Sequence, residues 1–247
     1  MLFKFPQKKI VLDCFTTYEH ILETAPIVPA MKLIPDWWKE LPNGYRDNEG
    51  RILPTMRSCV GMVDYYKKSI VMPLWSDLLI KVRSATDYNW AFSDEFSEAS
   101  YHPLEKQAAG FLANYAHIKL ESPWRLKCKE DIQWIWSHPA YSFSDNHHTV
   151  SLPGIVSYKK QHGTNVNILI HAEKEKEIFI PQGQPLIHMT PMSDRKIEIV
   201  RHLVNEREYS RITQNSRSIS FLRKYDVFNK RLEQFKDCPF HNHIKGK

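Results

Sequence analysis

Apolar and polar residues alternate with a period of two in three successive segments near the middle of the chain. The segments are 116–121, 124–128 and 132–136, and only Ile135 interrupts the alternation. Such alternation, with short breaks between the segments, is typical of antiparallel strands that bury one face. The region 116–201 is therefore predicted to form an antiparallel sheet.

A strand–turn–strand unit follows at residues 178–192. Two prolines bound its turn, and Gly183 between them is free to take a positive φ. Units of this kind build antiparallel barrels and sandwiches. The predicted fold class is mainly β (α+β), either an antiparallel β-sandwich or a cupin-like barrel.

Helices are predicted at both ends of this β region. Near the N-terminus, Pro35 suits the first position of a short helix and Asp36 suits its first turn. Beyond residue 203 the chain is mainly helical in pattern, and apolar residues recur there at helical spacing, namely Ile219, Leu222, Tyr225 and Phe228. We predict one β-rich domain, residues 1–202, followed by a C-terminal helix and tail, residues 203–247.

Composition narrows the class of protein. A chain of 247 residues with 42% hydrophobic residues can bury a sizeable core. No segment approaches the roughly 18 consecutive apolar residues of a membrane span, so no membrane partner is expected. The four cysteines are widely separated and form no Cys-x-x-Cys pair, which favours reduced thiols in a cytosolic protein.

The net charge of +6 is concentrated near the C-terminus. Residues 201–236 hold nine Lys or Arg against four Asp or Glu. A basic helix can contact nucleic acid, an acidic partner or only solvent, and solvent is the commonest case. The candidate contacts on this helix are Arg217, Arg223, Lys224 and Arg231.

Trp37 and Trp38 are the candidate contacts near the N-terminus. Because they are adjacent, they cannot both point the same way. One is expected to dock on the body while the other reaches a groove or a partner. The simpler alternative is that the pair seals the edge of a core.

His171, Glu173 and His188 form a candidate metal site. Two histidines and one carboxylate can bind iron or manganese in cupin-like barrels. The strand phase places all three opposite the apolar residues, on one polar face. In a closed barrel that face is the lumen, whereas in a sandwich it is the solvated side. The charged run 173–177 favours the solvated side.

Other chemical motifs are weaker. One further group of possible ligands is Cys238, His241 and His243, which suggests zinc but lacks a fourth ligand nearby. Another is His138, His147 and His148, which are interpreted as ordinary surface histidines around a loop. Phosphate-binding loops, G-x-S-x-G and H-E-x-x-H are missing from the sequence, which argues against common nucleotide-hydrolysing, esterase and metalloprotease classes.

Three motifs carry a resemblance to known proteins. They are PWRLKCKEDIQWIW, LPGIVSY and IFIPQGQPLIHMTPM, in that order along the chain. Their order resembles uncharacterised proteins of T4-like tailed phages of marine bacteria, which share an IPxWWK-type element, here Ile34, Pro35, Trp37, Trp38 and Lys39. It also resembles a bacterial family of unknown function with an IPxGxP-like turn. The resemblance covers about two-thirds of the chain and implies a phage origin and a compact β fold, but no catalytic residue.

Three functional hypotheses follow. The leading one is a non-catalytic phage protein, virion-associated or accessory, that binds a protein partner or itself in the host cytoplasm or the virion without a cofactor. The first alternative is a cupin-like small-molecule enzyme with iron or manganese in the barrel. The second is a weak nucleic-acid binder that uses the basic C-terminal helix.

Overall fold

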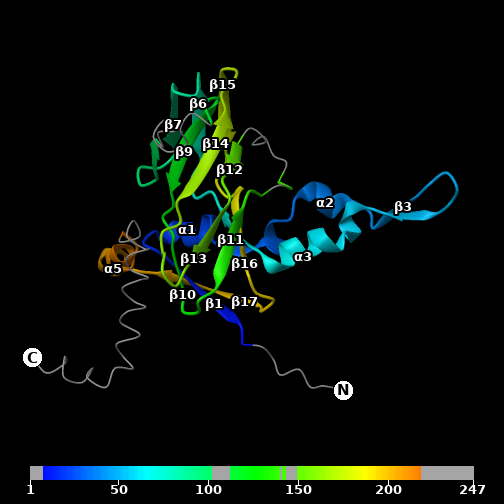
Figure 1. The fold of residues 1–247 in the computed structure, drawn as a ribbon, viewed down its shortest axis with the longest axis horizontal. Helices are drawn as coiled ribbons and strands as arrows, with labels where there is room; N and C mark the ends of the chain where they lie inside the picture. The colour runs from blue at the N-terminus through cyan, green and yellow to red at the C-terminus, as the bar shows by residue number, and fades with distance from the viewer. Residues whose placement is uncertain (1–7, 102–111, 140, 143–148, 218–247) are drawn as a thin grey trace, which may run out of the picture.

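The computed structural model describes residues 8–101, 112–139, 141–142 and 149–217. It consists of a β body from which one segment, residues 30–68, projects to one side (Figure 1). We call this segment the arm. The C-terminal helix lies on the opposite side of the body (Figure 1).

The largest sheet of the body is antiparallel and has five strands. Its strands, in spatial order, are β13 (Gly154–Ser157), β11 (Gln133–Ser137), β16 (Pro185–Pro191), β5 (Ile70–Pro73) and β2 (Val28–Pro29). The predicted turn at Gly183 leads directly into β16, at the centre of this sheet.

Three smaller sheets complete the body. One contains β12 (Thr149–Ser151), β14 (Val166–His171), β9 (Tyr115–Glu121) and β8 (Glu98–Tyr101). Another contains β15 (Lys176–Ile180), β6 (Leu78–Val82) and β7 (Tyr88–Phe92). The third contains β10 (Arg125–Cys128), β1 (Ile10–Thr16) and β17 (Ile197–Leu203), and its β1–β17 pair is parallel.

Helices are few. The body carries α1 (Glu19–Thr24) and α5 (Glu206–Arg217). The arm contains two short 3-10 helices, η1 (Ala30–Leu33) and η2 (Met56–Ser58), the helices α2 (Asp36–Glu40) and α3 (Val60–Lys68), and a hairpin of β3 (Gly44–Arg46) and β4 (Ile52–Pro54). None of the described helices is long and apolar enough to cross a membrane.

The main core lies inside the body and receives side chains from all four of its sheets. The predicted alternation is confirmed here: Ile118, Leu120, Trp134 and Trp136 are all buried. Ile135, which interrupts the pattern, points outward and is exposed. Alternation therefore identified the core-facing side of these strands correctly.

A second, smaller core joins the arm to the outer face of the five-stranded sheet. Its buried residues are Ala30, Trp38, Met62, Tyr66 and Val71. We call it the arm core. Because Val71 belongs to β5 while its neighbours Ile70 and Met72 enter the main core, this strand is buried on both faces.

The prediction of a mainly β, antiparallel fold is confirmed. Of its two versions, the sandwich-like one is present, since the described strands close no barrel. The predicted N-terminal helices are present as well. Of the predicted C-terminal helix the structure describes α5, and the apolar positions Ile219, Leu222, Tyr225 and Phe228 lie outside the described residues.

Candidate functional site

A groove lies where the arm meets the β body, with a volume of about 480 Å³. The arm supplies one wall and the turn before β16 supplies the other. Its lining residues are Lys32, Leu33, Ile34, Pro35, Asp36, Trp37, Lys39, Ser142, Pro181, Gln184 and Pro185. Two sequence motifs that lie far apart along the chain, IPDWWK and IPQGQP, therefore meet in one place.

The two tryptophans diverge from α2, as their adjacency predicted. Trp38 is buried in the arm core against Tyr66, with ring centroids 5.2 Å apart, and its Nε1 donates to the Met56 carbonyl at 3.1 Å. Trp37 is only half-buried; its Nε1 donates to the Tyr141 carbonyl at 3.0 Å, and its ring lines the groove. Trp38 therefore seals a core edge, while Trp37 packs against the arm core from outside and also lines the groove.

The turn that forms the other wall is held by hydrogen bonds to the body. Gly183 has φ +84°, which confirms the expected positive φ, and its amide donates to the Leu74 carbonyl at 2.8 Å. Gln182 donates from its amide to Asp77 at 2.7 Å and from its side chain to the Trp75 carbonyl at 2.8 Å. The positions of the flanking prolines are thus fixed before any ligand binds.

Charge in the groove is weakly positive. Lys39 and Asp36 form an ion pair at 2.8 Å, so their charges offset each other. Lys32 has no ion-pair partner among the residues that the structure describes. The groove thus combines an apolar wall with one uncompensated cation.

His188 lies in the sheet beneath the arm and is 0% exposed. Its ring stacks on Tyr65 with centroids 4.8 Å apart and meets the edge of Tyr66 at 5.3 Å. Neither ring nitrogen has a hydrogen-bond partner within the described part of the chain. Burial, with a smaller contribution from His138, lowers the pKa of His188 to about 4, so the imidazole is neutral at pH 7.

The predicted solvated position of His188 is therefore wrong. The phase argument placed Ile187 and Met189 correctly in the main core, but it took the opposite face to be solvent. That face is covered by the arm. His188 pairs across the sheet with Val71, a residue of the arm core.

The proposed metal ligands are not gathered into one site. His171 and Glu173 lie together at the end of β14 and just beyond it, with Nδ1 and Oε2 3.8 Å apart and both side chains partly or largely exposed. His188 belongs to a different sheet. Within the described ranges no group of three or more His, Cys, Asp or Glu residues is placed to hold a metal ion.

Several other candidates fall wholly or partly outside the described residues. They are Arg223, Lys224, Arg231, His147, His148, Cys238, His241 and His243, and the side chain of Arg217. His138 is described, and it is not an ordinary surface histidine. Its Nδ1 accepts a hydrogen bond from the Ser151 amide at 3.2 Å, and burial lowers its pKa.

The sequence predicted that one of the two tryptophans reaches a groove or a partner, but it did not identify Pro181, Gln184 and Pro185 as the other wall of this groove. The signal present in the sequence was the composition of the two motifs: IPDWWK combines a proline with two tryptophans, and IPQGQP combines two prolines with a glycine turn.

Comparison with family models, with curated proteins and with solved structures gave no match. The functional argument therefore rests on the geometry of this chain.

Proposed function

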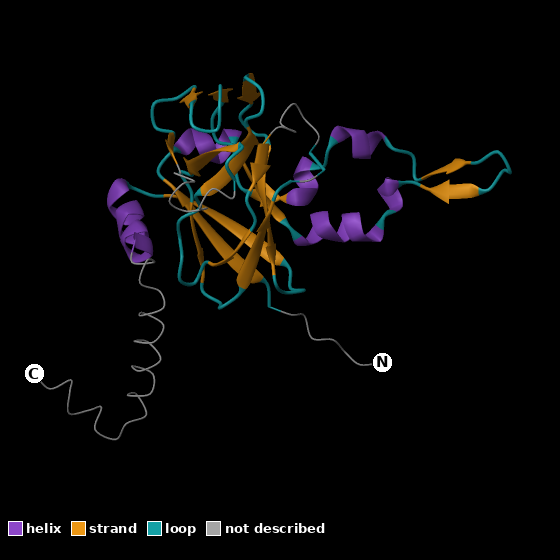
Figure 2. Ribbon diagram, turned by 45° about the horizontal axis from the view of Figure 1, so that its top comes forward, coloured by secondary structure: helices purple, strands orange, loops and turns teal. Residues whose placement is uncertain are grey.

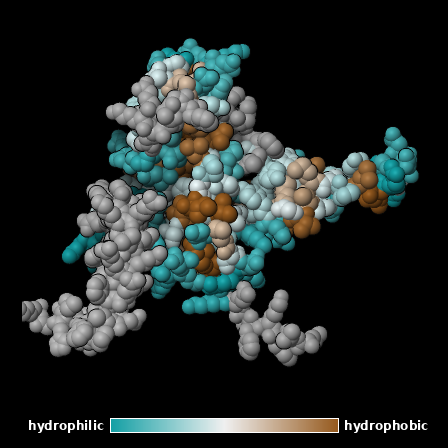
Figure 3. Space-filling model, in the orientation of Figure 1, coloured by the Kyte–Doolittle hydropathy of each residue, from teal (hydrophilic) through white to brown (hydrophobic). Residues whose placement is uncertain are grey.

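We propose that the protein is non-catalytic and acts by protein–protein binding through the outer part of the arm. The observation that carries this proposal is a set of large apolar side chains in solvent on a projecting element. They are Tyr45 (54% exposed), Ile52 (69%), Met56 (47%) and Val60 (72%). Apolar side chains lie along the arm and at its hairpin (Figure 3). Exposed apolar groups gathered on one element are characteristic of interaction sites.

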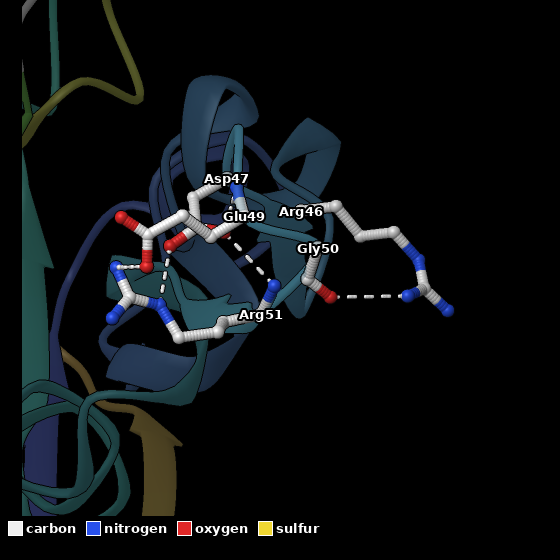
Figure 4. A network of polar contacts seen from close by, with 5 residues as sticks. All are labelled: Arg46, Asp47, Glu49, Gly50 and Arg51. Carbon is white, nitrogen blue, oxygen red and sulfur yellow. Dashed lines mark hydrogen bonds and ion pairs between the residues drawn. The ribbon is translucent and has the colours of Figure 1, made fainter.

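The hairpin at the end of the arm stands away from the body (Figure 2). A two-stranded hairpin is only marginally stable by itself in water. Here its tip is held by its own polar contacts: Asp47 accepts from Arg51 Nε at 2.8 Å, Arg51 also pairs with Glu49 at 2.9 Å, and Arg46 donates to the Gly50 carbonyl at 3.2 Å (Figure 4). The tip is thus ordered before it meets a partner.

The occupant that fits this surface is a second copy of the chain. The tip carries two arginines and two acidic residues, so it is neutral in a chain whose net charge is +6. Apolar groups lie on both faces of the hairpin, since Tyr45 and Ile52 have opposite strand phase. A surface with balanced charge and apolar groups can pair with itself about a twofold axis.

This role agrees with the leading functional hypothesis from the sequence, a virion-associated or accessory phage protein. The host cytoplasm or the virion would then be its location. An assembly surface of this kind needs neither a cofactor nor a metal. The phage origin rests on the sequence resemblance alone.

Sedimentation velocity across a wide range of protein concentration tests the proposal. We expect the wild type to dimerise with rising concentration, and the double variant Tyr45→Ser/Ile52→Ser to remain monomeric. Phe179→Ser is the matched control, because Phe179 is an exposed apolar residue on β15, outside the arm. A wild type that stays monomeric throughout, or an arm variant that dimerises equally well, would contradict the proposal.

A further inference from the structure

We infer that the arm is an acid-sensitive element: protonation of His188 releases helix α3 from the five-stranded sheet while the β body stays folded. The inference goes beyond the proposed dimerisation and does not depend on it. It starts from the surroundings of His188, whose ring is covered by two tyrosines of the arm.

The groups around His188 are neutral or become positive. Tyr65 and Tyr66 of α3 pack on its ring, and burial raises the pKa of both phenols, so their hydroxyls stay protonated. Tyr141 packs against both of these tyrosines. His138, just beyond β11, acts on His188 as a like charge, because it also becomes a cation when it titrates. Among the described residues no carboxylate forms an ion pair with the ring of His188.

The elements packed on His188 bring no compensating charge. Strands β5 and β11, on either side of β16, contain no charged residue. The charged residues of α3 are exposed, namely Asp64, Lys67 and Lys68, and Lys68 is paired with Asp194 at 2.8 Å. A proton on His188 therefore creates a buried charge without a partner. Stacking on a tyrosine ring offsets part of the cost, but an unpaired buried charge is strongly unfavourable.

Release of the arm relieves this cost while few contacts break. The arm core has five buried residues, whereas the main core draws on all four sheets of the body. The indole of Trp38 donates its hydrogen bond within the arm, so that bond survives release. The contacts that are lost include the Tyr65–Ser137 hydrogen bond at 3.1 Å and the exposed Lys68–Asp194 pair. Opening of one such segment costs less free energy than global unfolding.

The size of the effect follows from proton linkage. With the arm closed the pKa of His188 is about 4, and with the arm open the ring meets water and takes its ordinary value of 6.5. Between these values the open arm binds a proton and the closed arm does not, so opening becomes more favourable as the pH falls. From pH 7.5 to 4.5 the equilibrium constant for opening should rise roughly 50- to 100-fold.

Amide hydrogen exchange of the full chain at pH 7.5 and 4.5, with a chelator present, tests the inference. Helix α3 has nine residues, too few to persist without the sheet, so its amides exchange whenever the arm opens. Protection factors are compared, because the intrinsic exchange rate itself depends on pH. We expect the protection of α3 to fall roughly 50- to 100-fold in acid. At both pH values it should lie well below that of β9 in the body.

Three variants identify the group responsible. In His188→Leu the acid-induced loss of α3 protection should largely disappear, and His188→Gln serves if leucine packs badly. His171→Leu is the control for replacing a histidine with leucine outside the arm core, and its arm should still open in acid. Trp38→Ala loosens the arm core, so NMR titration of the His188 ring should show a pKa closer to 6.5 than in the wild type.

Three results would overturn the inference. Equal protection of α3 and β9 at pH 4.5 would show that the arm opens only with the whole protein. An unchanged acid response in His188→Leu and His188→Gln would assign it to another group. A pKa near 6.5 for His188 in the wild type would show that the closed arm tolerates the charged ring. The variant Tyr45→Ser/Ile52→Ser should respond to acid like the wild type, so failure of the dimer and failure of acid release are separate outcomes.

Discussion

Replacing His188 with leucine should change how the stability of the protein depends on pH. In the folded chain the pKa of His188 is about 4, against an ordinary value of 6.5, because burial disfavours the charged ring. Between these two values the unfolded chain binds a proton at this residue and the folded chain does not. The free energy of unfolding should therefore fall as the pH falls through this interval.

The magnitude follows from the size of the pKa shift. Each pH unit within the interval lowers the free energy of unfolding by about 1.4 kcal/mol, and the whole interval by about 3 kcal/mol. His188→Leu removes this contribution. At pH 7.5 the ring is neutral in both states, and leucine also removes two buried nitrogens that lack a partner in the described structure. At that pH we expect no loss of stability, or a gain of about 1 kcal/mol.

Urea unfolding of the wild type and His188→Leu at several pH values from 7.5 to 4.5 measures the effect. Part of the pH dependence should remain in the variant, because burial also lowers the pKa values of His138 and His162. The quantity of interest is the difference between the two slopes. His171→Leu is the control for replacing a histidine with leucine, at a half-exposed position outside the arm core.

Parallel pH profiles for the wild type and His188→Leu would refute this account of the buried ring. A different result would revive the iron or manganese hypothesis. If a chelator lowers the stability of the wild type at pH 7.5 but not that of the variant, His188 holds a metal, because metal binding and folding are coupled.

Three further predictions concern the framework of the fold and can be checked by urea or thermal unfolding. Gly183→Val should lower the free energy of unfolding by about 1–2 kcal/mol because φ is +84°, whereas Gly154→Val, in open space on β13, should have a small effect. Trp38→Ala should lower the free energy of unfolding by about 3–5 kcal/mol through loss of packing in the arm core. Truncation after Val204 should lower the melting temperature, because it removes α5 and the hydrogen bond from Tyr209 to the Pro123 carbonyl at 2.9 Å.

The main core was predictable because it needs only local information. In segments such as 116–121 and 132–136 one face meets the core, and alternation shows which residues lie on that face, although His117 on the opposite face of the first segment is buried as well. The exposed Ile135 confirms the rule at the one position that breaks the pattern. The positive φ of Gly183 was predictable for the same reason, since it follows from the turn residues alone.

Burial of His188 could not be predicted by the same rule. Alternation shows which residues share a face, but it does not show what covers each face. The sequence held one hint in the neighbouring strand: Ile70–Pro73 contains no polar residue, which is typical of a strand buried on both faces. The covering element is the arm, and the sequence does not show that this segment folds back on the sheet.

The groove depends on tertiary arrangement even more strongly. Residues 34–39 and 181–185 come together because β5 lies between β2, which leads into the arm, and β16, which follows the turn. This strand order was not deducible from the turn signals or from alternation. The residue types were visible in the sequence as candidates, but their proximity was not.

The proposed dimer surface and the proposed acid response share one foundation, the arm core. Trp38 packs there against Tyr66, whose ring in turn meets His188. The same core fixes the direction in which the hairpin projects. Trp38→Ala should therefore weaken dimerisation and raise the pKa of His188, whereas Tyr45→Ser/Ile52→Ser and His188→Leu should each affect one of the two properties. If Trp38→Ala, still folded by circular dichroism, left both properties intact, the arm core would be a local packing feature and not the support of either one.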